Sequence, residues 1–151
     1  MSEPVLVLGV GNLLVGDEGV GVHAIQALQE MEWPEHVDLL DGGTGGFHLL
    51  GHLSGYPRII LIDATRDGNP PGTVAAFEPR LPSDFPPSLG AHDIGLKDLI
   101  SALALTGPIP DMTVVTVSIE ELKPMEMSLS PEVEAAVPEV CARVRSLLGL
   151  C

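Results

Sequence analysis

The sequence predicts a single three-layer α/β domain over residues 1–151, with a mostly parallel five-stranded sheet between helices on both faces. One observation is that apolar runs typical of strands alternate with amphipathic segments typical of helices, a pattern that favours parallel strands joined by helical crossovers. Another is composition: with 45% hydrophobic and 19% charged residues, the chain can form one sizeable core. No linker or internal repeat divides it.

The first strand and first helix are joined by a glycine-rich turn. Val5–Gly9 is an apolar run, and the glycines at positions 9, 11 and 16 allow the backbone to turn tightly. The helix is expected from about Asp17 to Trp33. Its apolar face should consist of residues spaced three or four apart, namely Val20, Ala24, Leu28 and Met31.

Four further strands are expected: Val37–Asp41, Arg58–Ala64, Thr73–Glu78 and Met112–Ile119. The continuous apolar run in Arg58–Ala64 is typical of a strand buried on both faces, which places it at the centre of the sheet. Thr73–Glu78 lies between prolines and is expected at an edge. The remaining elements should be a short helix from Thr44 or Gly45 to His52, a long loop over Pro79–Ala91, and helices over Gly95–Leu105 and from Pro131 onward.

The charge balance excludes several classes of partner. A formal net charge of −14 with only seven Lys and Arg residues argues against nucleic acid and against an anionic membrane. No apolar run reaches membrane-spanning length and the N-terminus does not resemble a signal peptide, so we expect a cytoplasmic protein. Cys141 and Cys151 stand in no metal-ligand spacing and are expected to be structural or incidental.

A dinucleotide-binding fold is a rival interpretation of the glycine turn. Gly9 and Gly11 begin a G-x-G-x-x-G pattern, but the third glycine position is occupied by Leu14. Asp17 and Glu18 would moreover place negative charge where a pyrophosphate should lie. We therefore expect no nucleotide.

Acidic residues follow the carboxyl ends of the expected strands, where α/β proteins bind their ligands. They are Asp17 and Glu18 after the first strand, Asp41 after the second, Asp63 after the third and Glu120 after the last. His92 lies on a loop that could reach the same edge. Two carboxylates and an imidazole suit a divalent ion such as nickel or zinc, so Glu18, Asp63 and His92 are candidate ligands.

Each candidate also has a structural interpretation. Asp17 is expected to be the N-cap of the first helix, and Glu120 to be solvated. Asp41 could equally serve the chemistry or cap the Gly-Gly turn. For Asp63 a functional role is favoured over a structural one, because a carboxylate at the end of a buried strand costs free energy without a partner. His48 and His52 share a helix face but lack the H-E-x-x-H pattern of a zinc site.

Four motifs occur in order along nearly the whole chain. They are G-V-G-N-L-L-x-x-D-E-G-x-G over Gly9–Gly21, D-G-G-T-x-G over Asp41–Gly46, I-D-A over Ile62–Ala64 and H-D-I-G-L over His92–Leu96. Together they resemble the hydrogenase maturation endopeptidases. The family fold implied is a twisted sheet between helices with one antiparallel edge strand. We assign that strand to Thr73–Glu78.

The resemblance also implies an activity: removal of the C-terminal extension from the large-subunit precursor of a [NiFe] hydrogenase. Glu18, Asp63 and His92 match the family's nickel ligands, and the nickel belongs to the substrate and is bound only transiently. The loop Asp41–Thr44, with Gly42, Gly43 and Thr44, matches the substrate-recognition segment.

Two questions stay open at this point. Either the metal polarises the scissile carbonyl, or Asp41 activates water as a general base. A noncatalytic metal- or partner-binding protein on the same scaffold is the alternative to a peptidase. We expect a monomer whose partner is the hydrogenase precursor.

Overall fold

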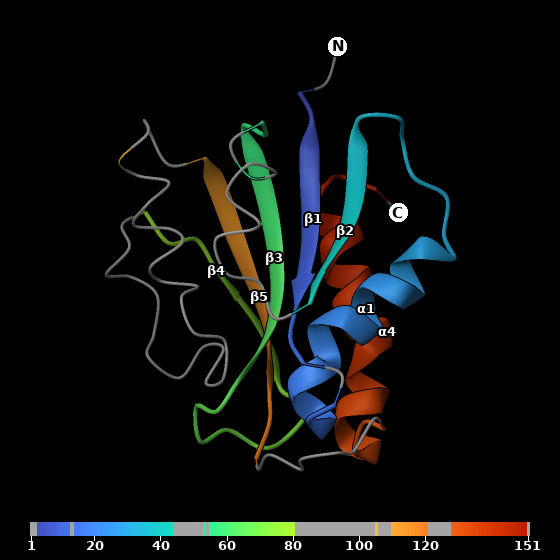
Figure 1. Ribbon diagram of the computed structural model, residues 1–151, viewed down its shortest axis with the longest axis vertical. Coiled ribbons are helices and arrows are strands. Elements are labelled where there is room, and N and C mark those ends of the chain that lie inside the picture. Colours follow the sequence, from blue (N-terminus) through green and yellow to red (C-terminus); the bar gives the residue numbers. More distant parts are fainter. Residues whose placement is uncertain are drawn as a thin grey trace.

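The computed structural model describes residues 3–12, 14–43, 53, 55–80, 105, 110–120 and 128–150. Figure 1 shows the elements of this part of the chain. In chain order they are β1 (Val5–Val10), the short 3-10 helix η1 (Gly16–Gly19), α1 (Val20–Gln29), β2 (Val37–Gly43), β3 (Arg58–Thr65), β4 (Val74–Phe77), β5 (Asp111–Ser118) and α4 (Pro131–Leu147).

The five strands form one twisted sheet in the order β2-β1-β3-β5-β4. The pairs β1–β2, β1–β3 and β3–β5 are parallel, whereas β4 runs antiparallel to β5. The prediction of an antiparallel edge strand is confirmed, and so is the central position of β3. Seven of the eight residues of β3 are buried, as expected for a strand covered on both faces.

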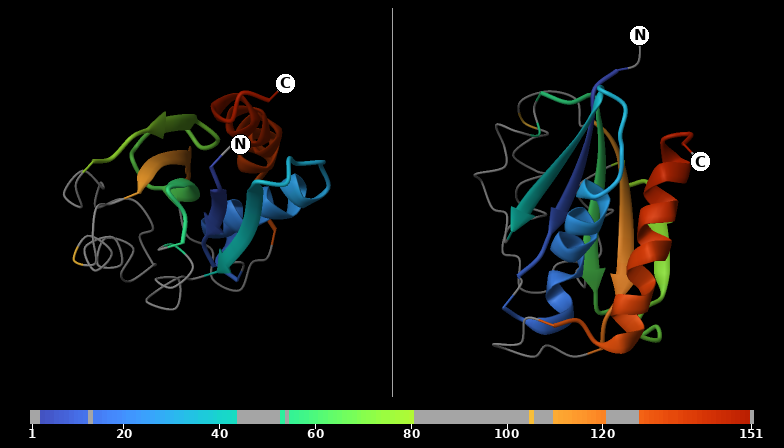
Figure 2. Two further views of the ribbon diagram at one scale, coloured as in Figure 1. Left: turned by 90° about the horizontal axis from the view of Figure 1, so that it is seen from above. Right: turned by 90° about the vertical axis from the view of Figure 1, so that its right-hand side faces the viewer.

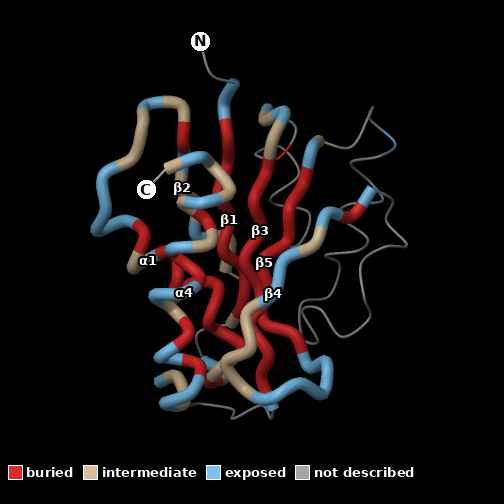
Figure 3. The backbone as a smooth tube through the Cα atoms, turned by 180° about the vertical axis from the view of Figure 1, so that it is seen from behind, coloured by how far each residue is buried: buried red, intermediate tan, exposed pale blue. Residues whose placement is uncertain are grey.

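Helices α1 and α4 pack side by side on one face of the sheet (Figures 1 and 2). Val20, Ala24 and Leu28 of α1 pack there with Val133, Val140 and Val144 of α4, against Ile60, Ile62 and Val115 of the strands. The opposite face presents a second apolar cluster that includes Leu8, Leu61, Val114 and Leu53. Figure 3 shows the continuous burial of the central strands.

Several predicted segments lie outside the described residues. They are the helix from Thr44 or Gly45 to His52, most of the helix over Gly95–Leu105, and the loop beyond Arg80. Among the described residues, no helix has the length and apolar character needed to span a membrane.

Helix α1 is shorter than the sequence suggested. The segment around Asp17 forms the 3-10 helix, and the α-helix begins only at Val20. It ends at Gln29, where the indole N–H of Trp33 donates a hydrogen bond of 2.7 Å to the Leu28 carbonyl and so satisfies a helix-end acceptor. Placing Met31 on the buried face was therefore wrong: it follows the helix and is 40% exposed.

Two glycines let η1 and α1 approach the strands closely. A Cβ atom on Gly21 would collide with the Val10 carbonyl oxygen and would lie 2.5 Å from that of Ile62. A Cβ atom on Gly11 would collide with the carbonyl oxygen of Glu18. Only glycine permits these contacts, which press the start of the helix against the carboxyl ends of β1 and β3.

Candidate functional site

The carboxyl ends of the parallel strands form a common edge, as the acidic pattern predicted. The ladder pairs Gly9 of β1 with Asp41 of β2 on one side and with Ile62 of β3 on the other. Asp41 and Asp63 therefore lie within one residue of the same level, on strands separated only by β1. Ligands of α/β proteins bind at this edge.

Glu18 reaches this edge from η1 and is buried, with 1% of its surface exposed. The Glu18 backbone packs against Gly11. Gly21, three residues after Glu18, packs against Val10 and Ile62. The two glycine contacts thus hold Glu18 close to the ends of β1 and β3. The glycines of this turn therefore position the segment that carries the Glu18 carboxylate.

Asp63 is completely buried near the end of β3. One of its carboxylate oxygens, Oδ1, accepts a hydrogen bond of 2.8 Å from the Ala64 backbone N–H. Strand alternation places Asp63 on the same face as Leu61, away from α1 and α4. Buried carboxyl groups at the ligand edge of an α/β sheet are characteristic of functional sites.

The third predicted ligand, His92, lies outside the described residues, as does Thr44 of the recognition loop. Within the described ranges, no group of three or more His, Cys, Asp or Glu side chains is arranged to hold a metal ion. The described part of the site therefore supplies Glu18 and Asp63, two of the three predicted ligands.

Asp17 does not have the role that the sequence predicted. The N-cap of α1 is Gly19, and no side chain caps the helix there. Asp17 instead accepts hydrogen bonds of 2.7 Å from both the backbone N–H and the hydroxyl of Ser130, the N-cap residue of α4. The N-cap prediction was wrong because the two partners are 113 residues apart, and no local pattern reveals such a contact.

The segment Asp41–Gly43 forms a turn-like end of β2 in which Asp41 is exposed and both glycines are partly buried. Asp41 Oδ1 accepts a hydrogen bond of 2.9 Å from the Gly43 N–H, and Gly43 has a φ of 54°, a conformation that favours glycine. The Gly11 N–H donates to the Gly43 carbonyl over 2.6 Å, which ties this turn to the loop that leads to Glu18. Asp41 is thus a turn-forming residue whose carboxylate stays accessible.

A pocket of about 450 Å³ opens beside the same edge, where β3 and β5 end. It is lined by Arg66, Gly68, Asn69, Pro70, Pro71, Ile119 and Glu120. Glu120 is exposed there, as its predicted solvation requires. No local sequence pattern predicts this pocket, because it depends on the β3–β4 loop lying against the end of β5.

Asp67 organises that loop. Its carboxylate accepts hydrogen bonds from the Ser118 hydroxyl, over 2.9 Å, and from the backbone and side chain of Asn69. Partial burial alone would raise the pKa of Asp67, but these hydrogen bonds to the charged form outweigh it, so its pKa lies below the usual value. The loop is therefore fixed by a charged side chain at neutral pH.

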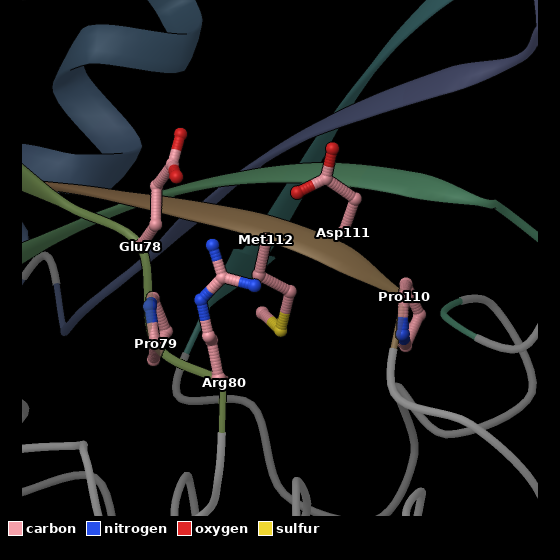
Figure 4. Close-up of a pocket in the computed structure, with 6 residues that line it drawn as sticks. All are labelled: Glu78, Pro79, Arg80, Pro110, Asp111 and Met112. Carbon is pink, nitrogen blue, oxygen red and sulfur yellow. The ribbon is translucent and has the colours of Figure 1, made fainter.

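A larger pocket, of about 570 Å³, lies at the opposite end of β5. Figure 4 shows its lining residues, with the Arg80 side chain extending toward Met112. Glu78 and Asp111 carry carboxylates there, but Glu78 follows the end of β4 and Asp111 begins β5. This pocket is thus separate from the edge that holds Glu18 and Asp63.

Comparison with known proteins agrees with this arrangement. The family described as HycI, hydrogenase maturation protease, matches residues 22–146. The hydrogenase 2 maturation protease of Escherichia coli (strain K12) is 38% identical over 148 residues, which cover 95% of this chain and 90% of that protein. The hydrogenase expression/formation protein HoxM of Cupriavidus necator is 34% identical over 95% of this chain and 73% of its own length.

Solved structures show the same relationship. The hydrogenase maturating endopeptidase HybD from E. coli superposes with a TM-score of 0.87 at 38% identity, over 96% of this chain and 91% of that one. A hydrogenase 2 maturation peptidase from a Thaumarchaeota archaeon gives a TM-score of 0.78 at 31% identity, over 99% and 100% of the two chains. With most of the chain matched in sequence and in fold, the chain belongs to the hydrogenase maturation protease family and is a peptidase.

Proposed function

We propose that this chain is an endopeptidase that removes the C-terminal extension from the nickel-loaded large-subunit precursor of a [NiFe] hydrogenase. The observation that carries the proposal is the burial of Glu18 and Asp63 at the carboxyl edge of the sheet. A fold does not by itself imply a function, but two buried carboxyl groups at the ligand edge give this fold a means of binding a cation. Family membership names the reaction class.

The nickel ion is part of the substrate in this proposal. Glu18, Asp63 and His92 would provide two carboxylates and one imidazole, a set that binds nickel less firmly than several histidines or thiolates would. The ion would stay with the precursor, whose own ligands complete its coordination. Recognition would then depend on whether nickel has been inserted, and the enzyme would release the ion with its product.

The chemistry of cleavage belongs to the turn at Asp41–Gly43. Asp41 is exposed and lies within one residue of the level of Asp63, two strands away, so its carboxylate could activate a water molecule as a general base, as in an aspartyl-type endopeptidase. Gly42, Gly43 and Thr44 would bind the substrate backbone, since glycine allows a polypeptide to approach closely. Polarisation of the scissile carbonyl by the bound nickel is the alternative to an Asp41 base.

We further propose that the enzyme is a monomer in the cytoplasm. The net charge of −14 disfavours nucleic acid and anionic membranes as partners. The one cysteine among the described residues, Cys141, is a buried free thiol, which agrees with a reducing compartment. Burial raises the pKa of this thiol and keeps it neutral.

Cleavage should require nickel in the precursor. Purified protein is expected to contain little metal, and it should cut the nickel-loaded precursor while leaving the nickel-free precursor intact. Mass spectrometry of the precursor and elemental analysis of the enzyme test both points. Stoichiometric zinc together with equal cutting of both precursors would indicate an ordinary metallopeptidase, and binding of the loaded precursor without any cleavage would indicate a noncatalytic partner.

Replacing Asp41 with asparagine should separate the two chemical routes. The amide keeps an oxygen that can accept the hydrogen bond from Gly43, but it cannot take a proton. If Asp41 is the base, kcat should fall by roughly 100-fold or more. Asp38→Asn is the matched control, because Asp38 is an exposed aspartate on the same strand that is bonded to the Tyr56 hydroxyl. Normal turnover by the Asp41 variant would leave Asp41 as a turn residue and favour nickel.

A further inference from the structure

Strand β2 forms one edge of the described sheet. Its hydrogen bonds to β1 show which of its backbone groups point outward. The Val5 N–H donates to the His36 carbonyl over 2.9 Å, while Val5 is the register partner of Val37. In a parallel ladder this pattern directs the backbone groups of Asp38, Leu40 and Gly42 toward β1. The groups of Val37, Leu39 and Asp41 consequently face away from the sheet.

Only part of this outer edge is occupied by the described residues. The Val37 N–H donates to the Pro34 carbonyl over 3.0 Å, in the turn before the strand. No strand among the described residues pairs with the outer side of β2, which leaves the N–H and C=O groups of Leu39 and Asp41 outside any ladder in that part of the chain. Figure 1 shows β2 at the end of the sheet, with its carboxyl end next to that of β1.

The two edges of the sheet differ in how they are protected. Strand β4 is four residues long and is bounded by Pro70, Pro71 and Pro79, a common means of preventing an edge from pairing with another chain. Strand β2 is seven residues long and contains no proline. Of the two edges, only β2 leads directly into the turn that carries Asp41.

We propose that the outer edge of β2 binds the C-terminal extension of the precursor as an added antiparallel strand, held by the backbone groups of Leu39 and Asp41. This inference rests on the proposed function and describes how the same site would bind its substrate. Extended peptides commonly bind proteins by adding a strand to an open sheet edge. Main-chain hydrogen bonds would then supply much of the affinity.

The direction follows from the placement of the site. The nickel-bearing part of the precursor would lie over Glu18 and Asp63, at the ends of β1 and β3, and the scissile bond at Asp41–Gly43. The extension, which follows that bond, would have to run back along β2 from its carboxyl end. An added strand would lie about 14 Å from β3, three strand spacings away, which about four extended residues can span.

The charge of the edge adds a requirement on the bound peptide. Asp38 and Asp41 are both exposed on β2, and the whole chain carries a charge of −14. An acidic extension would be repelled, whereas a neutral or basic one would be tolerated or attracted. The occupant is therefore an extended peptide without net negative charge next to Asp38 and Asp41.

Hydrogen exchange measured by NMR on the wild-type protein tests this directly. Adding nickel-loaded precursor should slow exchange of the Leu39 and Asp41 amides by about tenfold or more, because these N–H groups gain acceptors, while the Leu40 and Gly42 amides already bonded to β1 change little. Unchanged exchange at Leu39 and Asp41 in the bound complex would overturn the inference. Protection that instead rises with enzyme concentration alone would assign the edge to a second copy of this chain, and would also overturn it.

Two proline substitutions test the same inference through the rate of precursor cleavage. Leu39→Pro removes an outward N–H and should slow precursor cleavage by at least about fivefold, as expected for a lost hydrogen bond. Ala76→Pro is the matched control: the Ser118 N–H donates to the Thr73 carbonyl, so the Ala76 N–H faces outward on the opposite edge, and cleavage should stay normal. Equal loss in both variants, or in neither, would contradict the inference.

The two tests keep the inference apart from the proposed function. If wild-type enzyme cleaves the loaded precursor but Leu39→Pro does so equally well and the amides stay unprotected, the added strand is wrong and the endopeptidase stands. If the amides become protected without any cleavage, the edge binds the precursor and the catalytic proposal is wrong. Absence of both protection and cleavage contradicts both.

Discussion

Replacing Glu18 by glutamine or Asp63 by asparagine should abolish cleavage of the nickel-loaded precursor, with a loss of roughly 100-fold or more. The amides match the carboxylates in shape but carry no charge, so they cannot neutralise a bound cation. Both side chains are buried, which means that solvent cannot compensate for the missing charge. Cleavage followed by mass spectrometry gives the rate.

The same two variants should remain folded. Each amide keeps the size of the carboxylate and an oxygen that can accept a hydrogen bond, so the thermal midpoint should change by only a few degrees. Glu120→Gln is a suitable control, since Glu120 is an exposed carboxylate at the same edge and its loss should leave the rate unchanged. Well-folded Glu18 and Asp63 variants that cut at the wild-type rate would refute the metal-site assignment.

Gly21→Ala should cause a large loss of stability, because a Cβ atom at this position has no room. Its added methyl group would meet the backbone carbonyls of Val10 and Ile62, neither of which can move without distorting the sheet. Overpacking of this kind costs about 3 kcal/mol. For a domain of this size the thermal midpoint should fall by roughly 6 to 12 °C, measurable by calorimetry.

Gly68→Ala distinguishes crowding from backbone strain. Gly68 has a φ of 85°, but a Cβ atom there would meet nothing within 4 Å, so its substitution should cost only about 1 kcal/mol. Gly21 lies inside α1, where alanine would otherwise favour the helix. An unfolding midpoint of Gly21→Ala equal to that of the wild type would show that the sheet accommodates the methyl group.

Much of this architecture could be predicted from local sequence patterns. Apolar runs predicted β1 and β3, β-branched residues predicted β5, and the prolines around β4 placed it at an edge. The position of Glu18 and Asp63 at one edge could be predicted because Glu18 follows β1 and Asp63 lies near the end of β3, and the carboxyl ends of parallel strands meet at one edge. Such inferences need only a residue's position relative to its own element.

Contacts between distant segments could not be predicted in this way. Asp17 binds Ser130 across 113 residues and Asp67 binds Ser118 across 51, and in both cases the hydrogen bonds form only because the sheet brings the segments together. The end of α1 was predicted wrongly for a different reason. The spacing of Met31 continues the apolar stripe, but α1 ends at Gln29, and the Trp33 indole donates a hydrogen bond to a carbonyl of its last turn.

The hydrogen bonds between Asp17 and Ser130 give the C-terminal helix a role in positioning the site. Asp17 is the immediate neighbour of Glu18 in η1, and Ser130 fixes the first residue of α4. Any change that loosens α4 from the sheet therefore also frees the segment that carries Glu18. A substitution in the last 21 residues can therefore lower activity without contacting the substrate, because hydrogen bonds between Asp17 and Ser130 connect α4 to η1.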